Sequence, residues 1–404
     1  MKTLLFVDDE SRVLQGLQRQ LRAMRNEWEM NFLDDGQKAL DFMAANRVDV
    51  VVSDMMMPRM DGAQLLAEVA KRHPNTVRII LSGHAEREAV LRLVGPAHQY
   101  LSKPCNADEL RYAIARALAL RDLLCNERLK QLATRVNCLP ALPALYHELA
   151  KELQKEDPLM ERVGEIISRD IGMSAKILQL VNSAFFGLPQ PVSNIADAVM
   201  YLGLSTVRSL VLSLQIFSQF DQRACKLFSF DVLASHSWTT GVASRQVAKF
   251  ERQDAKMQDQ CFLGGLLHDV GQLILATGMP EEYAAVLQTA KDRNRPVWQV
   301  EQEHFGATHA DVGAYLLGLW GLPNPIIEAV AMHHRPAMCI APGFSPVVAV
   351  HAADVFMHEQ PGVNTELPPP TLDMAHLTNL GFADRVEAWR EACLNENETQ
   401  PANL

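Results

Sequence analysis

The stretch VDVVVSDMMMPRMDG, residues 48–62, decides how the first part of this chain folds. Its apolar run over residues 48–53 is typical of a β-strand that is buried on both faces. Asp54 follows this run directly, so we expect its carboxylate at the carboxyl end of the strand. Asp61 stands before Gly62 and an amphipathic segment, which favours a helix N-cap at Asp61. The stretch therefore predicts a strand, a loop and a helix, in that order.

The same alternation continues on both sides of this stretch, through about residue 105. Four further apolar runs predict strands over 3–7, 30–33, 77–82 and 99–101. Amphipathic segments predict helices over 11–24, 37–45, 62–71 and 86–93. Strands and helices that alternate in this way form βαβ units, which build a parallel sheet with helices on both faces. The predicted fold class is α/β, with a five-stranded, doubly wound domain.

Charged and hydroxyl side chains occur at the ends of these predicted strands. Asp8 and Asp9 end the first strand, and Asp54 ends the third. Ser82 ends the fourth strand, and Lys103 follows the fifth. Because the carboxyl ends of the strands form the ligand site of a doubly wound sheet, we expect these groups in one pocket. Three converging carboxylates favour a Mg²⁺ ion between them, and with a lysine ammonium they could support transfer of a phosphoryl group to a carboxylate.

Four motifs carry these groups: VDDE at 7–10, SDMMMPRMDG at 53–62, LSGH at 81–84 and YLSKP at 100–104. Together they resemble the receiver domain of two-component response regulators, over about residues 1–120. The resemblance implies that Asp54 is the phosphoacceptor and that a sensor histidine kinase is the phosphodonor. It implies Mg²⁺ ligands at Asp8, Asp9, Asp54 and the backbone carbonyl of Met56. It also implies three switch residues, which are Ser82, Tyr100 and Lys103.

From residue 106 onward the pattern is helical. Residues 106–136 carry an apolar stripe, which predicts either a final receiver helix that extends into a linker helix or a plain final helix with a linker. Pro140 and Pro143 mark the next boundary. Beyond them, residues 137–375 are predicted to form an all-α output domain, and residues 376–404 a C-terminal tail. A homodimer through the receiver or through the 106–136 helix is a further hypothesis.

The second half of this output domain, from about residue 230, is rich in histidine. Seven of its side chains lie on predicted helices among apolar neighbours: His236, His268, Asp269, His309, His333, His334 and Asp354. Imidazole nitrogens and carboxylate oxygens from several helices can hold one or two divalent metals in a bundle core. A metal in that position could activate water toward a phosphoester. The competing interpretation is that these are interior histidines that hydrogen-bond between helices.

The order of these groups, with the segment GLLHDVGQLIL at 265–275, resembles the HD superfamily of metal-dependent phosphohydrolases. That resemblance implies that the ligands of a divalent transition metal, Fe or Mn, are His236, His268, Asp269, His309, His333 or His334, and Asp354. Longer segments, among them LPALP at 139–143 and THADVGAYLLGLWGLP at 308–323, resemble the HDOD domain over about residues 135–355. HDOD domains serve mainly as signalling output modules, which favours a protein-interaction or regulatory role. His334 is followed by RPAMCIAP and lacks the DGxGYP segment of HD-GYP domains, which disfavours cyclic di-GMP as a substrate.

Charge and hydropathy restrict the remaining function classes. The formal net charge of −10 comes without a cluster of Lys and Arg, so we predict no direct DNA binding. The apolar start of the chain runs into acidic residues 8–10, which is unlike a secretory signal. The apolar stretch 202–217 contains Arg208 and Gln215, which favours a buried helix over a membrane span. We expect a cytoplasmic protein without membrane contact.

Two hypotheses for the output follow from these patterns. The first is a regulatory module whose surface for an unknown protein or nucleotide ligand is controlled by phosphorylation of Asp54. The second is a phosphorylation-gated, metal-dependent phosphohydrolase that uses the histidine and aspartate set. The receiver motifs and the helix periodicity support the first hypothesis, whereas the histidine set is the only support for the second.

Overall fold

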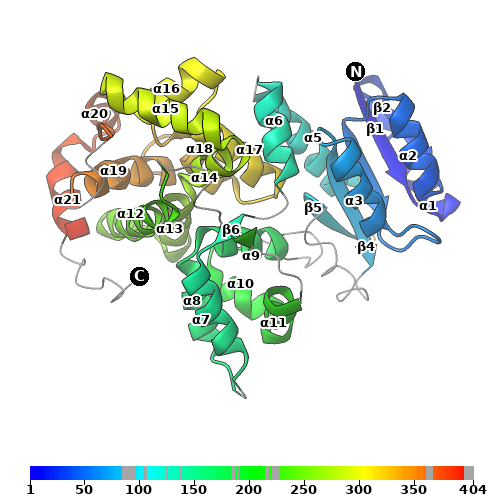
Figure 1. Ribbon diagram of the computed structural model, residues 1–404, viewed down its shortest axis with the longest axis horizontal. Helices are drawn as coiled ribbons and strands as arrows, with labels where there is room; N and C mark the ends of the chain where they lie inside the picture. Colours follow the sequence, from blue (N-terminus) through cyan, green and yellow to red (C-terminus); the bar gives the residue numbers. More distant parts are fainter. Residues whose placement is uncertain are drawn as a thin grey trace.

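The computed structural model describes residues 1–83, 97–103, 107–123, 126–136, 139–155, 157–182, 188, 191–213, 218–219, 228–339, 341–360 and 367–394. Within these residues the chain forms an α/β domain followed by a larger all-α part (Figure 1). The predicted fold class is confirmed.

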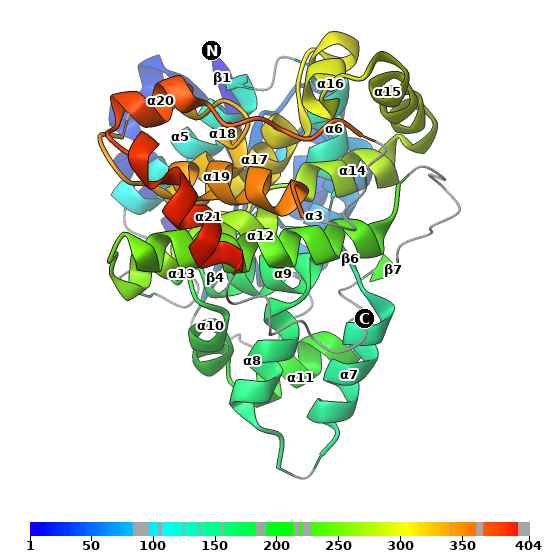
Figure 2. The same cartoon turned by 90° about the vertical axis from the view of Figure 1, so that its left-hand side faces the viewer.

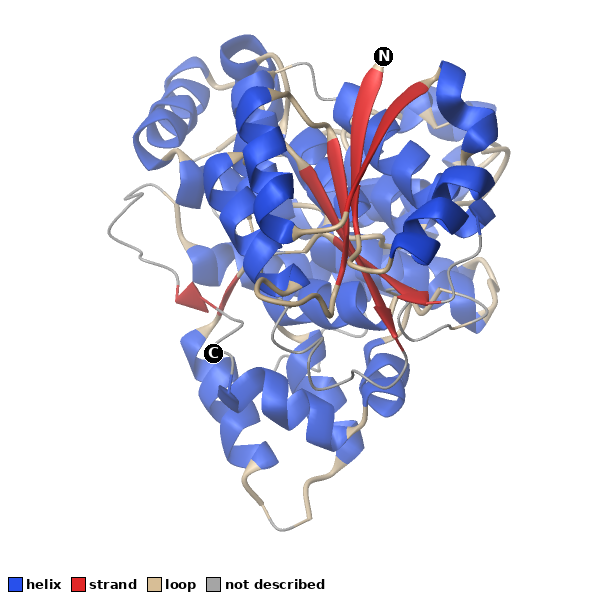
Figure 3. Ribbon diagram, turned by 90° about the vertical axis from the view of Figure 1, so that its right-hand side faces the viewer, coloured by secondary structure: helices blue, strands red, loops and turns tan. Residues whose placement is uncertain are grey.

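Five parallel strands form the sheet of the first domain, in the order β2–β1–β3–β4–β5. The strands are β1 (Lys2–Val7), β2 (Trp28–Leu33), β3 (Val50–Asp54), β4 (Val77–Gly83) and β5 (Gln99–Lys103). Figure 3 shows the twisted sheet between its covering helices. All five residues of β3 are buried, as its apolar run predicts. The strand order reverses at β1, so the carboxyl ends of β1 and β3 border the switch point where ligands gather.

Helices α1 (Ser11–Gln20), α2 (Gly36–Ala45) and α3 (Gly62–Arg72) alternate with these strands. The helix predicted over 11–24 ends as an α-helix at Gln20, and a 3₁₀ helix, η1 (Arg22–Asn26), follows it. The helix predicted over 86–93 lies outside the described residues.

The loop from β3 to α3 is held close to the strand end. A Cβ atom on Gly62 would lie 2.1 Å from the carbonyl oxygen of Asp54, so only glycine permits this approach. Asp61 is the N-cap of α3: its carboxylate accepts a hydrogen bond of 2.8 Å from the backbone N–H of Gln64. The predicted cap is confirmed, and the loop is fixed at both of its ends.

The segment predicted as helical over 106–136 contains two helices, α5 (Ala107–Leu123) and α6 (Glu127–Arg135). The side chain of Asn126 caps α6 by accepting hydrogen bonds from the backbone of Arg128 and Leu129. The Asn126 amide also donates to the carbonyl of Phe305, which lies in the all-α part. A new cap therefore starts α6, and this cap is bonded to the output domain.

The all-α part has a smaller lobe and a larger one (Figure 2). The smaller lobe contains α7 (Pro143–Leu153), α8 (Met160–Ser168), α9 (Ile171–Val181), α10 (Ile195–Leu202) and α11 (Leu204–Ser213). The larger lobe begins with α12 (Phe230–Phe250), α13 (Ala255–Leu267), α14 (Val270–Gly278), α15 (Pro280–Arg293) and α16 (Val297–Phe305). It continues with α17 (His309–Leu319), α18 (Asn324–Met332), η3 (Pro336–Met338) and α19 (Pro346–His358). Two short strands, β6 (Pro140–Ala141) and β7 (Ser218–Gln219), pair in parallel.

The prediction of a C-terminal tail over 376–404 is wrong as far as Leu394. This region contains α20 (Met374–Asn379), η4 (Ala383–Arg385) and α21 (Val386–Leu394). Trp389 of α21 is fully buried, and its indole N–H donates a hydrogen bond of 2.9 Å to Glu251. Because α21 covers apolar side chains of α12 and α19, the all-α domain extends past residue 375. Residues 395–404 lie outside the described part of the chain.

A buried polar contact joins the α/β domain to the all-α part. Arg78 and His98, at the start of β4 and just before β5, are both fully buried. The Arg78 guanidinium donates to the backbone carbonyl of Thr134 in α6, at 3.0 Å, and the His98 imidazole lies 3.0 Å from the same carbonyl. The amide of Gln179 in α9 donates to the carbonyl of His98, at 3.2 Å. Helix α6 and the smaller lobe, through α9, thus contact the sheet at the start of β4 and just before β5.

One stretch, Ala255–Gly278, is long and apolar enough to cross a membrane by length and composition alone. It comprises α13 and α14, and 83% of its most apolar window is buried inside the protein. A helix pair in a protein core passes the same test, so this stretch is weak evidence for a span.

Candidate functional site

The strand ends of the α/β domain bring together the carboxylates that the sequence predicts. Asp8 and Asp54 are buried, and Asp9 is exposed beside them. One carboxylate oxygen of each of these three residues lies within 4.8 Å of the other two, close enough to share one cation. The Lys103 ammonium lies 2.6 Å from Asp8 and 2.5 Å from Asp54. The pocket therefore contains an acidic cluster and its counter-charge at the switch point of the sheet.

Burial sets the charge balance of this pocket. It raises the pKa of Asp54, and neighbouring Asp8 adds to the rise while Lys103 opposes it. For Lys103 burial acts in the other direction, but the carboxylates of Asp54 and Asp8 outweigh it and raise the pKa of the ammonium. The pair is thus a partly buried carboxylate held beside a lysine that stays protonated. This arrangement suits transfer of an anionic group to Asp54.

The remaining predicted receiver residues lie around this pocket. Ser82 is fully buried at the end of β4, one strand away from Asp54. Met56, whose carbonyl is the predicted fourth Mg²⁺ ligand, is 56% exposed in the loop after β3. Tyr100 is almost fully buried in β5, and burial raises the pKa of its phenol far above the usual range. Its electrostatic neighbour is Arg78, the residue that contacts the helical part. The predicted switch residue therefore lies beside the junction of the two domains.

The seven histidine and aspartate side chains of the output domain come from five places in the larger lobe. His236 is on α12, and His309 is the first residue of α17. His268 and Asp269 occupy the junction between α13 and α14. The other three follow α18 or lie on α19: His333, His334 and Asp354. All seven converge in the interior, as the metal-site hypothesis requires.

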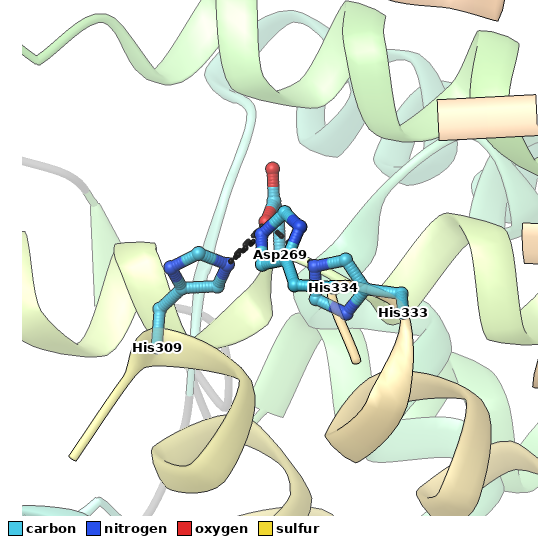
Figure 4. A group of neighbouring side chains, drawn as sticks. All are labelled: Asp269, His309, His333 and His334. Atoms are coloured by element: carbon cyan, nitrogen blue, oxygen red, sulfur yellow. Dashed lines mark hydrogen bonds and ion pairs between the residues drawn. The ribbon is translucent and has the colours of Figure 1, made fainter. Parts of the chain in front are cut away.

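These side chains form two groups that can each hold one metal ion. Asp269, His309, His333 and His334 make the first group, which Figure 4 shows, and the second is His236, His268 and Asp354. Asp269 faces both groups: one carboxylate oxygen lies 3.1 Å from His309 Nε2, and the other lies 3.2 Å from His268 Nε2. Asp269 is therefore placed to bridge two metal ions.

Hydrogen bonds on the outer side of the cluster orient three of the imidazoles. The Nδ1 atom of His268 lies 2.6 Å from the carbonyl of Gly265, and that of His333 lies 2.8 Å from the carbonyl of Val330. His309 Nδ1 lies 2.7 Å from Glu301. A carbonyl or carboxylate oxygen can only accept, so Nδ1 carries the proton in each ring and Nε2 faces the cluster.

The atoms that face the cluster fit metal ions. Among the described residues, His268 Nε2, His333 Nε2 and one oxygen of Asp269 are buried without a well-aligned hydrogen bond, and that Asp269 oxygen lies 3.1 Å from His309 Nε2. Buried polar atoms normally have partners, because an unpaired one costs about 1–3 kcal/mol. Unpaired imidazole nitrogens that point at an unpaired carboxylate oxygen are what a cation between them would satisfy.

Most groups of the cluster have the charge states of metal ligands, but the carboxylates of Asp269 and Glu301 outweigh burial and raise the pKa of His268 and of His309, the latter to about 10, so these two rings would each release a proton on binding a metal. Burial opposes ionisation of Asp269 and Asp354, but the surrounding histidines outweigh it and hold the pKa of both carboxyls well below their usual range. Burial, helped by His268 and His309, lowers the pKa of His333 to about 3. Burial likewise lowers the pKa of His334 far below its usual value. Ionised carboxylates and neutral imidazoles are the forms that bind metals.

Two residues of the site were not predicted from the sequence. Glu301 is fully buried on α16; it accepts hydrogen bonds from the backbone N–H and Nδ1 of His309 and, at 3.1 Å, from the Tyr283 hydroxyl. His358 lies 3.0 Å from Asp354 and beside the ring of His236. The four-residue spacing of Asp354 and His358 on one helix could have indicated the second residue. Glu301 reaches the site from a separate helix, so no local spacing indicates it.

Comparison with known proteins assigns both parts of the chain to family models. The model of the response regulator receiver domain matches residues 4–115, and that of the HDOD domain matches residues 139–336. An uncharacterized protein of Treponema pallidum is 27% identical over 207 residues, which are 50% of this chain and 39% of that protein. Response regulator MprA of Mycolicibacterium vanbaalenii is 35% identical over 118 residues, 29% of this chain and 49% of that protein. This chain therefore spans less than half the length of these curated relatives.

Two solved structures cover most of the chain. The MmoQ response regulator of Methylococcus capsulatus is 26% identical, with a TM-score of 0.47, over 63% of this chain and 98% of that one. A virulence factor of Campylobacter jejuni is 18% identical, with a TM-score of 0.50, over 67% of this chain and 98% of that one. At that identity the second likeness concerns the fold alone.

Proposed function

Because this chain carries a response regulator receiver domain followed by an HDOD domain, we propose that it is a response regulator whose output is a metal-dependent phosphohydrolase site controlled by phosphorylation of Asp54. The observation that carries the proposal is the convergence of seven ligands, with unpaired nitrogen and oxygen atoms that face each other. A purely protein-binding output would not require this convergence. The proposed place of action is the cytoplasm.

The input step is transfer of a phosphoryl group from a histidine kinase to Asp54. An oxygen of the Asp54 carboxylate forms a bond to phosphorus, and the bond between phosphorus and the donor imidazole nitrogen breaks. The imidazole keeps the electron pair of that bond. Lys103, which already contacts Asp54 at 2.5 Å, holds the negative charge of the transferred group. Mg²⁺ bound by Asp8, Asp9, Asp54 and the carbonyl of Met56 would neutralise further phosphoryl charge.

The contact between the domains offers a route from this pocket to the output site. Tyr100 and Arg78 are electrostatic neighbours, and Arg78 donates to the carbonyl of Thr134. The hydroxyl of Thr134 lies 3.4 Å from that of Tyr315 on α17, and the same helix begins with His309. A shift of β5 after phosphorylation would therefore reach a metal ligand through one rigid helix. Coupling of this kind is a change in the relative stability of two arrangements.

In the output site, the residues of this chain bind the metal ions and orient the reactants. Divalent metals there would supply Lewis-acid activation of water and of a phosphoryl oxygen. Asp269 would hold the two ions together, and His268, His309 and His333 keep their Nε2 atoms directed inward through their outer hydrogen bonds. His358, beside Asp354, is the nearest imidazole outside the predicted ligand set and could carry a proton to the leaving group.

The receiver proposal is tested by labelling. Incubation of the full chain with a radiolabelled small phosphodonor and Mg²⁺ should label the protein, and Asp54→Ala should remain unlabelled. Asp41→Ala, an exposed acid on α2, is the matched control and should be labelled like the wild type. Equal labelling of the Asp54→Ala variant would exclude Asp54 as the acceptor.

The output proposal is tested by metal content and hydrolysis. Protein purified with Mn²⁺ or Fe²⁺ should retain about two metal ions per chain, and it should hydrolyse a generic phosphodiester. Asp269→Asn should lose metal and activity, because this carboxylate faces both ligand groups. His304→Ala, on the exposed end of α16, should keep both. If the wild-type protein neither retains metal nor hydrolyses phosphodiesters, the phosphohydrolase proposal is wrong and the regulatory-module hypothesis remains.

A further inference from the structure

A cavity of about 160 Å³ opens directly onto the metal-ligand cluster. One side of it consists of the ligands His236, Asp269, His309, His334 and Asp354, with His358 beside them. The rest of the lining consists of apolar residues in or next to α12, α15 and α16 and in the segment before α20: Phe228, Val232, Leu233, Leu287, Pro296, Val297, Trp298, Leu367, Pro368 and Pro370. The cavity is therefore polar at the cluster and mostly apolar elsewhere.

No lysine or arginine occurs among the described residues that line this cavity. Gln272 and Ser229 add only neutral polar groups. Among the lining residues that the structure describes, only those at the metal-ligand end can thus balance negative charge on a ligand. A ligand with a second phosphate would have to place it against the apolar wall, where an unpaired charge loses its hydration. The wall selects for one anionic group per ligand.

The volume restricts the ligand further. Binding sites for drug-sized ligands generally enclose about 300–1,000 Å³, so a cavity of about 160 Å³ is small. It has room for about one phosphoryl group and one ring. A cyclic dinucleotide, with two phosphates and two bases, exceeds both the volume and the charge that the cavity accepts.

Trp298 gives the apolar wall a flat surface. The indole is partly exposed at the start of α16, and its plane lies within 18° of the His334 ring, at 5.7 Å between centroids. The stack fixes the indole beside a metal ligand, and the same indole lines the cavity. A ring attached to a metal-bound phosphoryl group would lie near this side chain. Stacking of the ring on such an aromatic side chain would stabilise the bound ligand.

We propose that the site binds compact phosphoesters that carry one anionic phosphoryl group and one aromatic or apolar substituent, with Trp298 as the residue that recognises the substituent. This inference rests on the proposed metal-dependent function, because the metal ions anchor the phosphoryl group. It adds the class of substrate to the reaction type.

Binding of phenylphosphonate, which has a non-hydrolysable bond from carbon to phosphorus, tests this proposal without relying on turnover. Calorimetry on the full chain loaded with Mn²⁺ should show that phenylphosphonate binds about tenfold more tightly than inorganic phosphate. A cyclic dinucleotide should bind more weakly than phenylphosphonate. Trp298→Ala should remove the tenfold preference and leave the affinity for inorganic phosphate unchanged, whereas Trp298→Phe should keep part of it. Trp238→Ala, a change on α12 in a different cavity, is the control and should keep the full preference.

The outcomes separate the two proposals. If the protein binds Mn²⁺ and phosphate but shows no preference for phenylphosphonate, or if Trp298→Ala keeps the preference, the substrate class proposed here is wrong and the metal site stands. If the protein binds no metal, the metal-dependent function itself fails, and this inference fails with it. Tighter binding of the cyclic dinucleotide would overturn the argument from charge and volume.

Discussion

Glu301 is a single buried residue that orients His309, one of the proposed metal ligands. Both of its oxygens accept hydrogen bonds, one from Tyr283 and the other from the backbone and ring of His309. A charged carboxylate with no exposed surface is costly unless it is paired in this way. In return it fixes the His309 ring, and it keeps the proton on Nδ1 so that Nε2 faces Asp269.

We therefore expect Glu301→Gln to weaken metal binding by about 10- to 100-fold, since partners behind a metal ligand typically contribute that much. Tyr283→Phe removes only the more distant hydrogen bond, so its effect should be several times smaller. Titration of metal-free protein with Mn²⁺, followed by calorimetry, measures both values. Unchanged affinity in Glu301→Gln would mean that the carboxylate supports packing and not the metal site.

At the scale of the element, Asp170 connects the start of α9 with the segment before α7. Its carboxylate accepts hydrogen bonds from the backbone N–H of Met173, at 2.7 Å, and of Leu142, at 2.6 Å. The side chain is fully buried, and burial raises its pKa to about 6 despite these bonds. The carboxyl group is therefore an N-cap that titrates well above the usual range for aspartate.

This shift predicts a stability difference that depends on pH. The folded protein holds the Asp170 proton up to about pH 6, whereas the unfolded chain releases it near the ordinary value of 3.8. The stability that comes from this group is complete below pH 4 and is lost as the pH rises through 6. Asp170→Asn keeps an acceptor without the charge. The free energy of unfolding of the variant minus that of the wild type should therefore be about 1–3 kcal/mol larger at pH 7.5 than at pH 4.

Urea unfolding of both proteins at pH 4, 5, 6 and 7.5 measures this difference. The stability of the variant minus that of the wild type should rise between pH 4 and pH 6 and then level off. Asp292→Asn, an exposed substitution near the end of α15, should give a difference that does not change over this range. A difference for Asp170→Asn that is independent of pH would contradict the shifted pKa.

At the scale of the whole molecule, the receiver and the output domain share a buried polar junction. Arg78 is fully buried, and although burial lowers the pKa of its guanidinium to about 10, the group remains charged at neutral pH. His98 beside it has a pKa far below the usual value, because it is buried and because Arg78 carries a positive charge. A charge in this position ties the sheet edge to the carbonyl of Thr134 in α6. Breaking the junction would remove the Thr134 acceptor from this buried charge, so the two domains should move together.

Phosphorylation of Asp54 should therefore change the affinity of the output domain for Mn²⁺ by about 5- to 150-fold, the usual range of coupling between two sites. Arg78→Met keeps much of the side-chain volume but removes the hydrogen bond to Thr134, so the change should fall below about threefold. Calorimetry with and without a small phosphodonor gives both values. As a control that the receiver domain of the variant is folded, its Asp54 should be labelled to the wild-type level. Full coupling in Arg78→Met would show that the signal takes another route.

The fold class and most residues of the two sites could be predicted from local sequence patterns. The alternation of apolar runs and amphipathic segments predicted the five strands, because a buried parallel strand and an amphipathic helix have different periods. Asp8, Asp9, Asp54 and Lys103 could be placed together because strand ends of a parallel sheet share one edge. The seven proposed metal ligands of the output domain could be named through the resemblance that the order of their motifs carries, since each motif is local in the sequence.

Only the tertiary structure decided the features that depend on distant residues. Asp269 lies between two ligand groups because packing sets the angle at which α13 and α14 meet. The spacing of residues in the sequence does not indicate this angle. Glu301 and Trp298 reach the site from α16, and Arg78 meets Thr134 across 56 positions of sequence. The helices after residue 375 were missed because their burial depends on α12 and α19, not on their own short and weakly periodic sequence. Local patterns specify elements, whereas long-range packing determines which side chains meet.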